Sequence, residues 1–64
     1  MKRFKVVEII RMLRNDGWEM TAQRGSHRQF THAFKPGKVT VNGHPSSNLS
    51  QEVLNSIFKQ AGWK

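Results

Sequence analysis

The chain has 64 residues, enough for one domain, and its eleven Lys and Arg against four Asp and Glu give a formal net charge of +7. It contains no cysteine, which excludes disulfides and thiolate metal ligands. No apolar run approaches the roughly 20 residues of a membrane span, and no apolar stretch of the signal-peptide kind follows the basic residues 2–5. We therefore expect a cytoplasmic protein with one domain over residues 1–64, whose charge favours a polyanionic partner.

The first predicted element is an amphipathic helix over about residues 4–16. Apolar residues recur there at the spacing of three and four that lines one helical face, and charged residues lie largely outside this stripe. The stripe consists of Val6, Ile9, Ile10 and Leu13. We expect the helix to end at Gly17, because glycine adopts the left-handed conformation that commonly follows a helix.

Two alternating runs then predict two strands joined by a tight turn at Gly25 and Ser26. The apolar face of the first strand is predicted to carry Trp18, Met20 and Ala22. In the second run, over residues 27–34, the same face is predicted to carry Phe30 and Phe34, with His32 between them. The opposite, polar face is predicted to carry Glu19, Thr21, Gln23, His27, Gln29, Thr31 and Ala33.

Turn chemistry over residues 35–38 separates the second run from a third short strand, Val39–Val41. Two short turns between consecutive strands imply an antiparallel sheet. A polar loop over residues 42–48 follows the third strand.

A second amphipathic helix is predicted over residues 51–61, with Ser50 as its N-cap. Its apolar stripe consists of Leu54, Ile57, Phe58 and Ala61. Gly62 is expected to end the helix, with Trp63 packing onto its last turn. The order α-β-β-β-α predicts an α+β fold, with a three-stranded antiparallel sheet and two helices on its apolar face.

His27 is the candidate catalytic residue. It follows the tight turn of Gly25 and Ser26 on the polar face, between Arg24 and Arg28. Imidazole titrates near neutral pH and can accept or donate a proton there. Cleavage of RNA by its own 2′-hydroxyl needs such a group, together with cations for the phosphate. A histidine on a polar strand face is, however, also typical of a solvated residue or a simple phosphate contact.

Residues of this turn, together with cations before and after it in the sequence, are the candidate RNA-binding residues. The set is Arg24, Gly25, Ser26, Arg28, Lys35 and Lys38. Alternation points Arg28 towards the opposite face of its strand, so we expect it to serve less directly.

The other two histidines have different surroundings. His32 shares a face with Phe30 and is expected to be partly buried and structural. His44 lies in the loop after the third strand, where it is either a loop hydrogen-bonding group or a second proton-transfer group. The spacings of five and twelve residues between the three histidines match no compact metal-ligand motif. No metal and no cofactor is therefore predicted.

In their order along the chain, these motifs resemble the HicA toxins of bacterial HicAB toxin–antitoxin systems. The residues that carry the resemblance are Asp16, Gly17, Trp18, Gly25, Ser26, His27, Phe30, Pro36, Gly37, Val39, Thr40, Val41, His44, Leu49, Leu54, Ile57, Lys59, Gln60, Ala61 and Gly62. They span nearly the whole chain. The family often has Val-Pro after the threonine of the third strand, and Gly-Thr at the start of the last helix. Here these places hold Val41-Asn42-Gly43 and Glu52-Val53.

The resemblance implies a fold like that of the double-stranded-RNA-binding domain. It also implies a metal-independent endoribonuclease, an mRNA interferase that arrests translation and growth, with His27 of the Gly-Ser-His motif as its catalytic residue. The implied partner is a HicB-type antitoxin that covers the active site. A charge of +7 should attract an acidic surface on such a partner.

Two other functions remain open on the residues alone. A non-catalytic RNA-binding module would have the same order of elements and the same basic balance. Double-stranded-RNA binders typically span about 16 base pairs, however, which is a long footprint for so short a chain. A DNA-binding regulator would need a helix-turn-helix, and the two predicted helices are not adjacent in sequence. Direct DNA binding by this chain alone, and binding to membranes, are therefore not expected.

Overall fold

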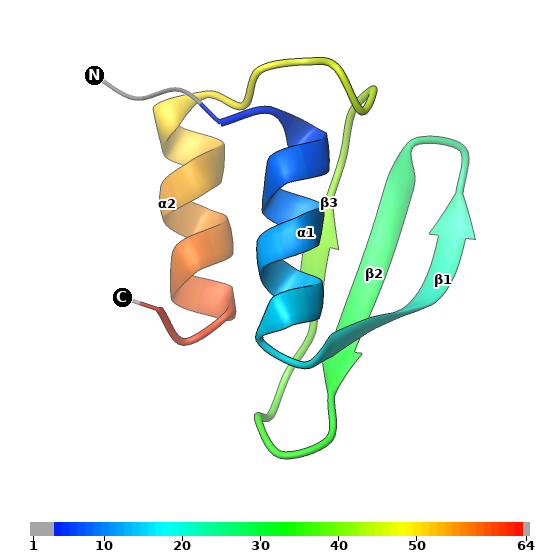
Figure 1. The fold of residues 1–64 in the computed structure, drawn as a ribbon, viewed down its shortest axis with the longest axis vertical. Helices are drawn as coiled ribbons and strands as arrows, with labels where there is room; N and C mark the ends of the chain where they lie inside the picture. Colours follow the sequence, from blue (N-terminus) through cyan, green and yellow to red (C-terminus); the bar gives the residue numbers. More distant parts are fainter. Residues whose placement is uncertain (1–3, 64) are drawn as a thin grey trace.

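The computed structural model describes residues 4–63 and contains two helices and an open three-stranded sheet (Figure 1). The elements are α1 (Val6–Asn15), β1 (Trp18–Arg24), β2 (His27–His32), β3 (Val39–Val41) and α2 (Gln51–Gln60). Both strand pairs are antiparallel, in the order β1-β2-β3. The predicted α+β fold of the double-stranded-RNA-binding-domain type is confirmed.

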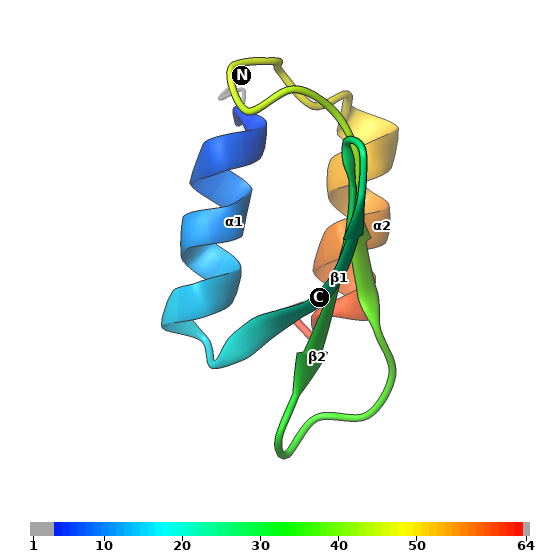
Figure 2. The ribbon, with the colours of Figure 1, turned by 90° about the vertical axis from the view of Figure 1, so that its right-hand side faces the viewer.

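The core lies between the two helices and one face of the sheet, which the 90° view shows nearly edge-on (Figure 2). Apolar residues at helical spacing in α1 and α2 meet alternating residues of the strands there. The buried set is Val6, Ile9, Leu13, Trp18, Phe30, Val39, Val41, Leu54, Ile57 and Ala61. Every strand and both helices contribute to this set, so none of the five elements can bury its apolar side alone.

The ends of α2 follow the sequence signals closely. Ser50 Oγ accepts the backbone N–H of Val53 at 3.3 Å, as an N-cap does. After the helix, Gly62 has a φ of +76°, and the N–H of Trp63 reaches back to the carbonyl of Phe58 at 2.9 Å. The indole of Trp63 packs edge-on against the ring of Phe58, with centroids 5.3 Å apart. The predicted cap and its apolar contact are therefore confirmed as a Schellman motif.

The loop after β3 supplies the cap of α1. The first N–H groups of a helix have no partner within the helix. Here the N–H of Val6 donates to the carbonyl of Ser47 at 3.0 Å, and that of Val7 donates to the carbonyl of Pro45 at 3.1 Å. This backbone contact fixes the loop against the start of α1.

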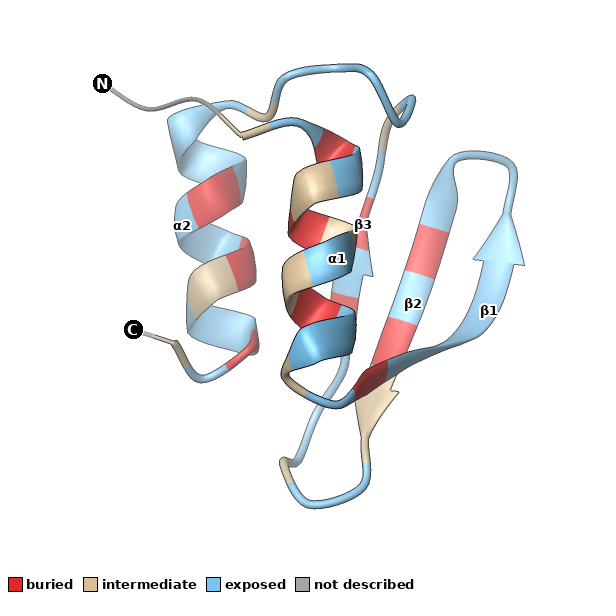
Figure 3. Ribbon diagram, in the orientation of Figure 1, coloured by how far each residue is buried: buried red, intermediate tan, exposed pale blue. Residues whose placement is uncertain are grey.

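The two edges of the sheet differ. On β3 the N–H of Thr40 donates to Oε1 of Gln60 at 3.2 Å, so a side chain of α2 occupies part of that edge. β1 pairs only with β2, and it lies well to the side of α1 (Figure 1). Beyond Trp18 its residues are exposed (Figure 3). The prediction of a half-buried first strand was therefore wrong for most of its length.

A β-bulge in β1 changes which of its residues share a face. The register runs from Met20 opposite Phe30 to Ala22 opposite Gln29, so Thr21 is the extra residue. Ala22 consequently lies on the open face, and Gln23 on the helix-facing side. The sequence-based placement of these two residues was wrong, because simple alternation holds only up to the bulge.

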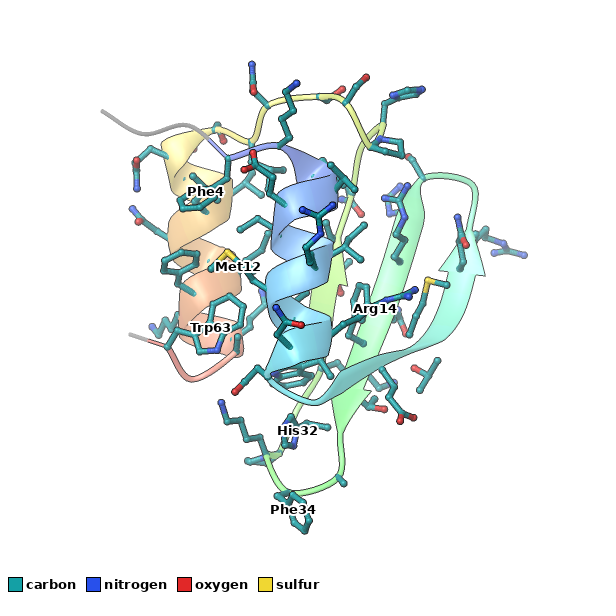
Figure 4. All side chains as sticks on the ribbon, in the orientation of Figure 1. Phe4, Met12, Arg14, His32, Phe34 and Trp63 are labelled. Carbon is teal, nitrogen blue, oxygen red and sulfur yellow. The ribbon has the colours of Figure 1, made fainter. Side chains whose placement is uncertain are left out.

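Phe34 was also placed wrongly by alternation. β2 ends at His32, and Phe34 lies in the following loop with 91% of its side chain exposed (Figure 4). The strand ends there because Nδ1 of His32 accepts the N–H groups of Phe34 and Lys35, at 3.0 and 3.2 Å. These bonds turn the backbone out of the sheet.

One carboxylate oxygen connects four segments of the chain. Oδ2 of Asp16, at the end of α1, accepts hydrogen bonds from Nζ of Lys35 at 2.6 Å and from the indole N–H groups of Trp18 and Trp63, at 3.0 and 3.1 Å. We call Asp16, Trp18, His32, Lys35 and Trp63 the Asp16 junction. It ties the end of α1 to the start of β1, to the loop before β3 and to the segment after α2.

His32 completes the junction from the sheet. Because its Nδ1 accepts two N–H groups, its proton lies on Nε2, which donates to the backbone carbonyl of Asp16 at 2.7 Å. The predicted structural role of His32 is confirmed. A Cβ on Gly17 would lie 2.8 Å from this Nε2, and Gly17 has a φ of +100°, so only glycine fits beside the ring.

The junction makes stability depend on pH. The hydrogen bond from Lys35, followed by that from Trp63, holds the pKa of the Asp16 carboxyl below its usual value, with partial burial opposing the shift. A carboxyl with a lowered pKa stabilises the fold above its unfolded value of about 3.9. That contribution is lost as the pH falls through the lower, folded value. The side chains of Lys35 and Asp16 are 35% and 31% exposed, so solvent weakens the ion pair.

We therefore expect Asp16→Asn to lower the melting temperature at neutral pH, and the gap to wild type to shrink below about pH 4. Thermal unfolding followed by circular dichroism over a range of pH measures this gap. Glu19→Gln removes an exposed carboxylate of β1 and should leave the melting temperature nearly unchanged. A gap for Asp16→Asn that is equally wide in acid would contradict the proposed ionisation.

Candidate functional site

A two-residue turn places His27 at the start of β2. Arg24 and His27 are paired across the hairpin, and Gly25 and Ser26 form the turn between them. Gly25 has a φ of +59° and Ser26 a negative one, which is the pattern of a type II′ turn. Glycine is required at this first position because it alone adopts that conformation without strain.

An open depression lies beside this turn, lined mainly from the uncovered face of the sheet, which carries every lining residue except Gln23. Its lining consists of Ala22, Gln23, Arg24, His27 and Gln29. The bulge at Thr21 brings the small side chain of Ala22 to this face, opposite Gln29, and so leaves space between larger neighbours. All five lining residues are exposed, so a large ligand can reach them without displacing a helix.

The lining carries an arginine and a histidine and no carboxylate. The side chains of Arg24 and His27 make no hydrogen bond or ion pair with the rest of the described chain, so both can turn towards a ligand. This arrangement suits an anion such as a phosphate group, with an imidazole beside it for proton transfer. No group of three His, Cys, Asp or Glu side chains able to hold a metal ion occurs within residues 4–63.

The structure brings together only part of the predicted site. Arg24, Gly25, Ser26 and His27 form one end of the β1–β2 hairpin. The loop after β2, which carries Lys35 and Lys38, lies at the opposite end of that strand (Figure 1). The sequence-predicted RNA-binding residues therefore fall into two groups.

The two lysines of the distant group also differ from each other. Nζ of Lys35 donates to Asp16 Oδ2 and to the carbonyl of Ala61, at 2.6 and 3.2 Å. Two of its three N–H groups are thus used within the fold. Lys38 is exposed and makes no such contact with the described residues, so it is the freer cation of the pair.

Arg28 faces the helices, as alternation predicted, and the residue is 8% exposed. Nη1 donates to the carbonyl of Ser26 at 3.2 Å and to the carbonyl of Gly43 at 2.9 Å. The contact with Gly43 joins the hairpin turn to the loop after β3. No local sequence signal indicates this contact, because it depends on how β2 and β3 pair.

His44 directly follows this contact and is exposed. Its Nδ1 lies 2.9 Å from Oγ of Ser46 and accepts the N–H of Ser46 at 3.3 Å. One of the two roles left open for His44, that of a loop hydrogen-bonding group, is therefore present. Nε2 takes part in neither of these contacts.

The fold and the hairpin define a small basic α+β protein of the double-stranded-RNA-binding-domain type, with a histidine exposed on the open face of its sheet. The family model described as the HicA toxin of bacterial toxin–antitoxin systems matches residues 7–63. The chain therefore belongs to the HicA toxin family and is the toxin of a toxin–antitoxin system. No curated protein matches the chain. No helix in the described part is long and apolar enough to cross a membrane.

Proposed function

We propose that this toxin is a metal-independent endoribonuclease that cleaves mRNA in the bacterial cytoplasm and so arrests translation and growth. The observation that carries the proposal is the exposed imidazole of His27 beside the guanidinium of Arg24, in a depression without carboxylates. Membership of the HicA toxin family supports the same function.

The chemistry needs one proton taken up and one supplied. The 2′-hydroxyl loses its proton to a base as its oxygen bonds to phosphorus, and the bond from phosphorus to the 5′-oxygen breaks. The departing 5′-oxygen takes a proton, which leaves a 2′,3′-cyclic phosphate and a 5′-hydroxyl. His27 serves as acid or base in this step, and Arg24 stabilises the charge that develops on the phosphate oxygens.

Replacing His27 tests the catalytic role directly. His27→Ala should slow cleavage of a long mRNA in EDTA by about 100-fold or more, because general acid–base catalysis contributes that much. The fold should persist, since the side chain is exposed and packs into no core. Gel analysis of the fragments gives the rate, and circular dichroism checks folding.

Identical purification of the variant also controls for a contaminating ribonuclease. A variant that cuts as fast as wild type would remove His27 from the mechanism. If neither protein cuts RNA although both bind it, the chain is a non-catalytic RNA-binding module.

Arg24 is expected to contribute to phosphate binding. Arg24→Met should weaken RNA binding. It should also reduce the steepness of log affinity against log salt by about 1, the effect of losing one phosphate contact. Arg11→Met removes the same charge from the exposed side of α1, which covers the other face of the sheet, and should change binding less. Fluorescence titrations at several salt concentrations measure both. Equal losses in the two variants would point to net charge rather than to a site at Arg24.

The antitoxin is proposed to be a HicB-type protein that covers the depression with an acidic surface. Electrostatic attraction to a chain of charge +7 speeds the encounter of the two proteins. The association rate should therefore fall as salt rises from low to physiological concentration, which stopped-flow mixing measures. A rate independent of salt would argue against an acidic partner surface.

A further inference from the structure

Arg28 is a buried cation without an acidic partner among the described residues. Placing a charge away from water is unfavourable unless polar groups compensate it. The compensation here consists of two backbone carbonyls, those of Ser26 and Gly43, and both bind the same nitrogen, Nη1. The hydrogen bonds that compensate the buried charge of Arg28 therefore come from these two peptide groups.

Each of these carbonyls belongs to the residue just before a histidine. Ser26 precedes His27, and Gly43 precedes His44. Because both carbonyl oxygens bind the same nitrogen, at 3.2 and 2.9 Å, the distance between the two oxygens cannot exceed the sum of these two hydrogen-bond lengths. His27, at the start of β2, and His44, in the loop after β3, therefore follow neighbouring peptide groups. Arg28 is the side chain that links these groups.

The loop of His44 is held on its other sides as well. The carbonyls of Pro45 and Ser47 accept the first N–H groups of α1. A Cβ on Gly43 would lie 3.4 Å from Cγ2 of Val6, and the φ of Gly43 is +113°. The backbone of His44 is thus fixed between Arg28 on one side and the start of α1 on the other.

The ring of His44 has a defined donor. Since its Nδ1 accepts the N–H of Ser46, the proton of the neutral imidazole lies on Nε2. That N–H is available for an oxygen atom outside the protein. Such a donor can stabilise negative charge without losing its proton.

We propose that Arg28 is a positioning residue that joins His44 to the site of His27, and that Nε2–H of His44 binds a non-bridging oxygen of the scissile phosphate. This inference rests on the proposed ribonuclease function. His44 keeps its proton throughout. Its hydrogen bond strengthens as the 2′-oxygen adds to phosphorus and charge builds on the phosphate oxygens.

Four variants test the inference: His44→Ala, Arg28→Met, Arg28→Lys and the double variant of His44→Ala with Arg28→Met. Single-turnover cleavage in EDTA gives the rate of the chemical step, and a separate titration gives the affinity for RNA. His44→Ala should slow the step by about 100-fold, the usual effect of losing one such donor. Arg28→Met should slow it to a similar extent through misplacement of that donor.

The double variant separates positioning from a general loss of stability. If Arg28 acts through His44, adding His44→Ala to Arg28→Met should slow cleavage little further. Affinity for RNA should change much less than the rate in both single variants. Arg11→Met removes an equal charge from the exposed side of α1, outside both loops, and should cleave at the wild-type rate. Arg28→Lys keeps the charge and can reach a carbonyl, so it should recover part of the rate.

The outcomes distinguish this inference from the proposed function. If wild type does not cleave, or His27→Ala cleaves equally well, the ribonuclease proposal fails first. If cleavage depends on His27 but His44→Ala retains the wild-type rate, the role of His44 is overturned. Independent, multiplicative losses in the double variant would overturn the positioning role of Arg28. If Arg28→Met unfolds, the cleavage rate of His44→Ala still tests the role of His44, because that side chain is exposed. The rate of Arg28→Lys then tests the positioning role of Arg28.

Discussion

The carboxylate of Asp16 is the interaction through which four segments of the chain are held together at one end of the fold. Its Oδ2 accepts three donors that come from β1, from the loop before β3 and from the segment after α2. Each donor lies on a different segment, and the apolar packing between these segments has no directional preference. Hydrogen bonds to one charged oxygen have a defined geometry, and so they fix the relative orientation of these segments. They determine how the end of each element meets the end of α1.

The opposite end of β2 carries the exposed residues of the candidate site. At the junction, the polar groups of His32 and Lys35 are used within the fold. At the hairpin turn, His27 and Arg24 are exposed and lack such partners among the described residues. Besides the pairing of β2 with β3, the side chain of Arg28 links that end to the loop that also caps α1. The protein thus places its rigid contacts away from the groups that we expect to meet RNA.

Much of the fold could be predicted from local sequence, and the failures have a physical cause. Helical periodicity and the signals at Ser50 and Gly62 identified both helices, because caps depend on neighbouring residues. The bulge at Thr21 has no glycine to indicate it, and it exchanged the faces of Ala22 and Gln23. For the candidate site, His27 and its turn were predictable from adjacent residues. The link from Arg28 to Gly43 was not, because it spans two strands.

The donor furthest along the chain has a consequence for synthesis of the toxin. Trp63 reaches Asp16 across 47 residues of sequence. The ribosome makes the chain from its N-terminus, at about 5–20 residues per second. The residues of all three strands and of all of α2 are therefore synthesised before the indole that completes the junction. A nascent chain cannot close this contact until Trp63 has emerged from the ribosome, so the fold reaches its full stability only after that point.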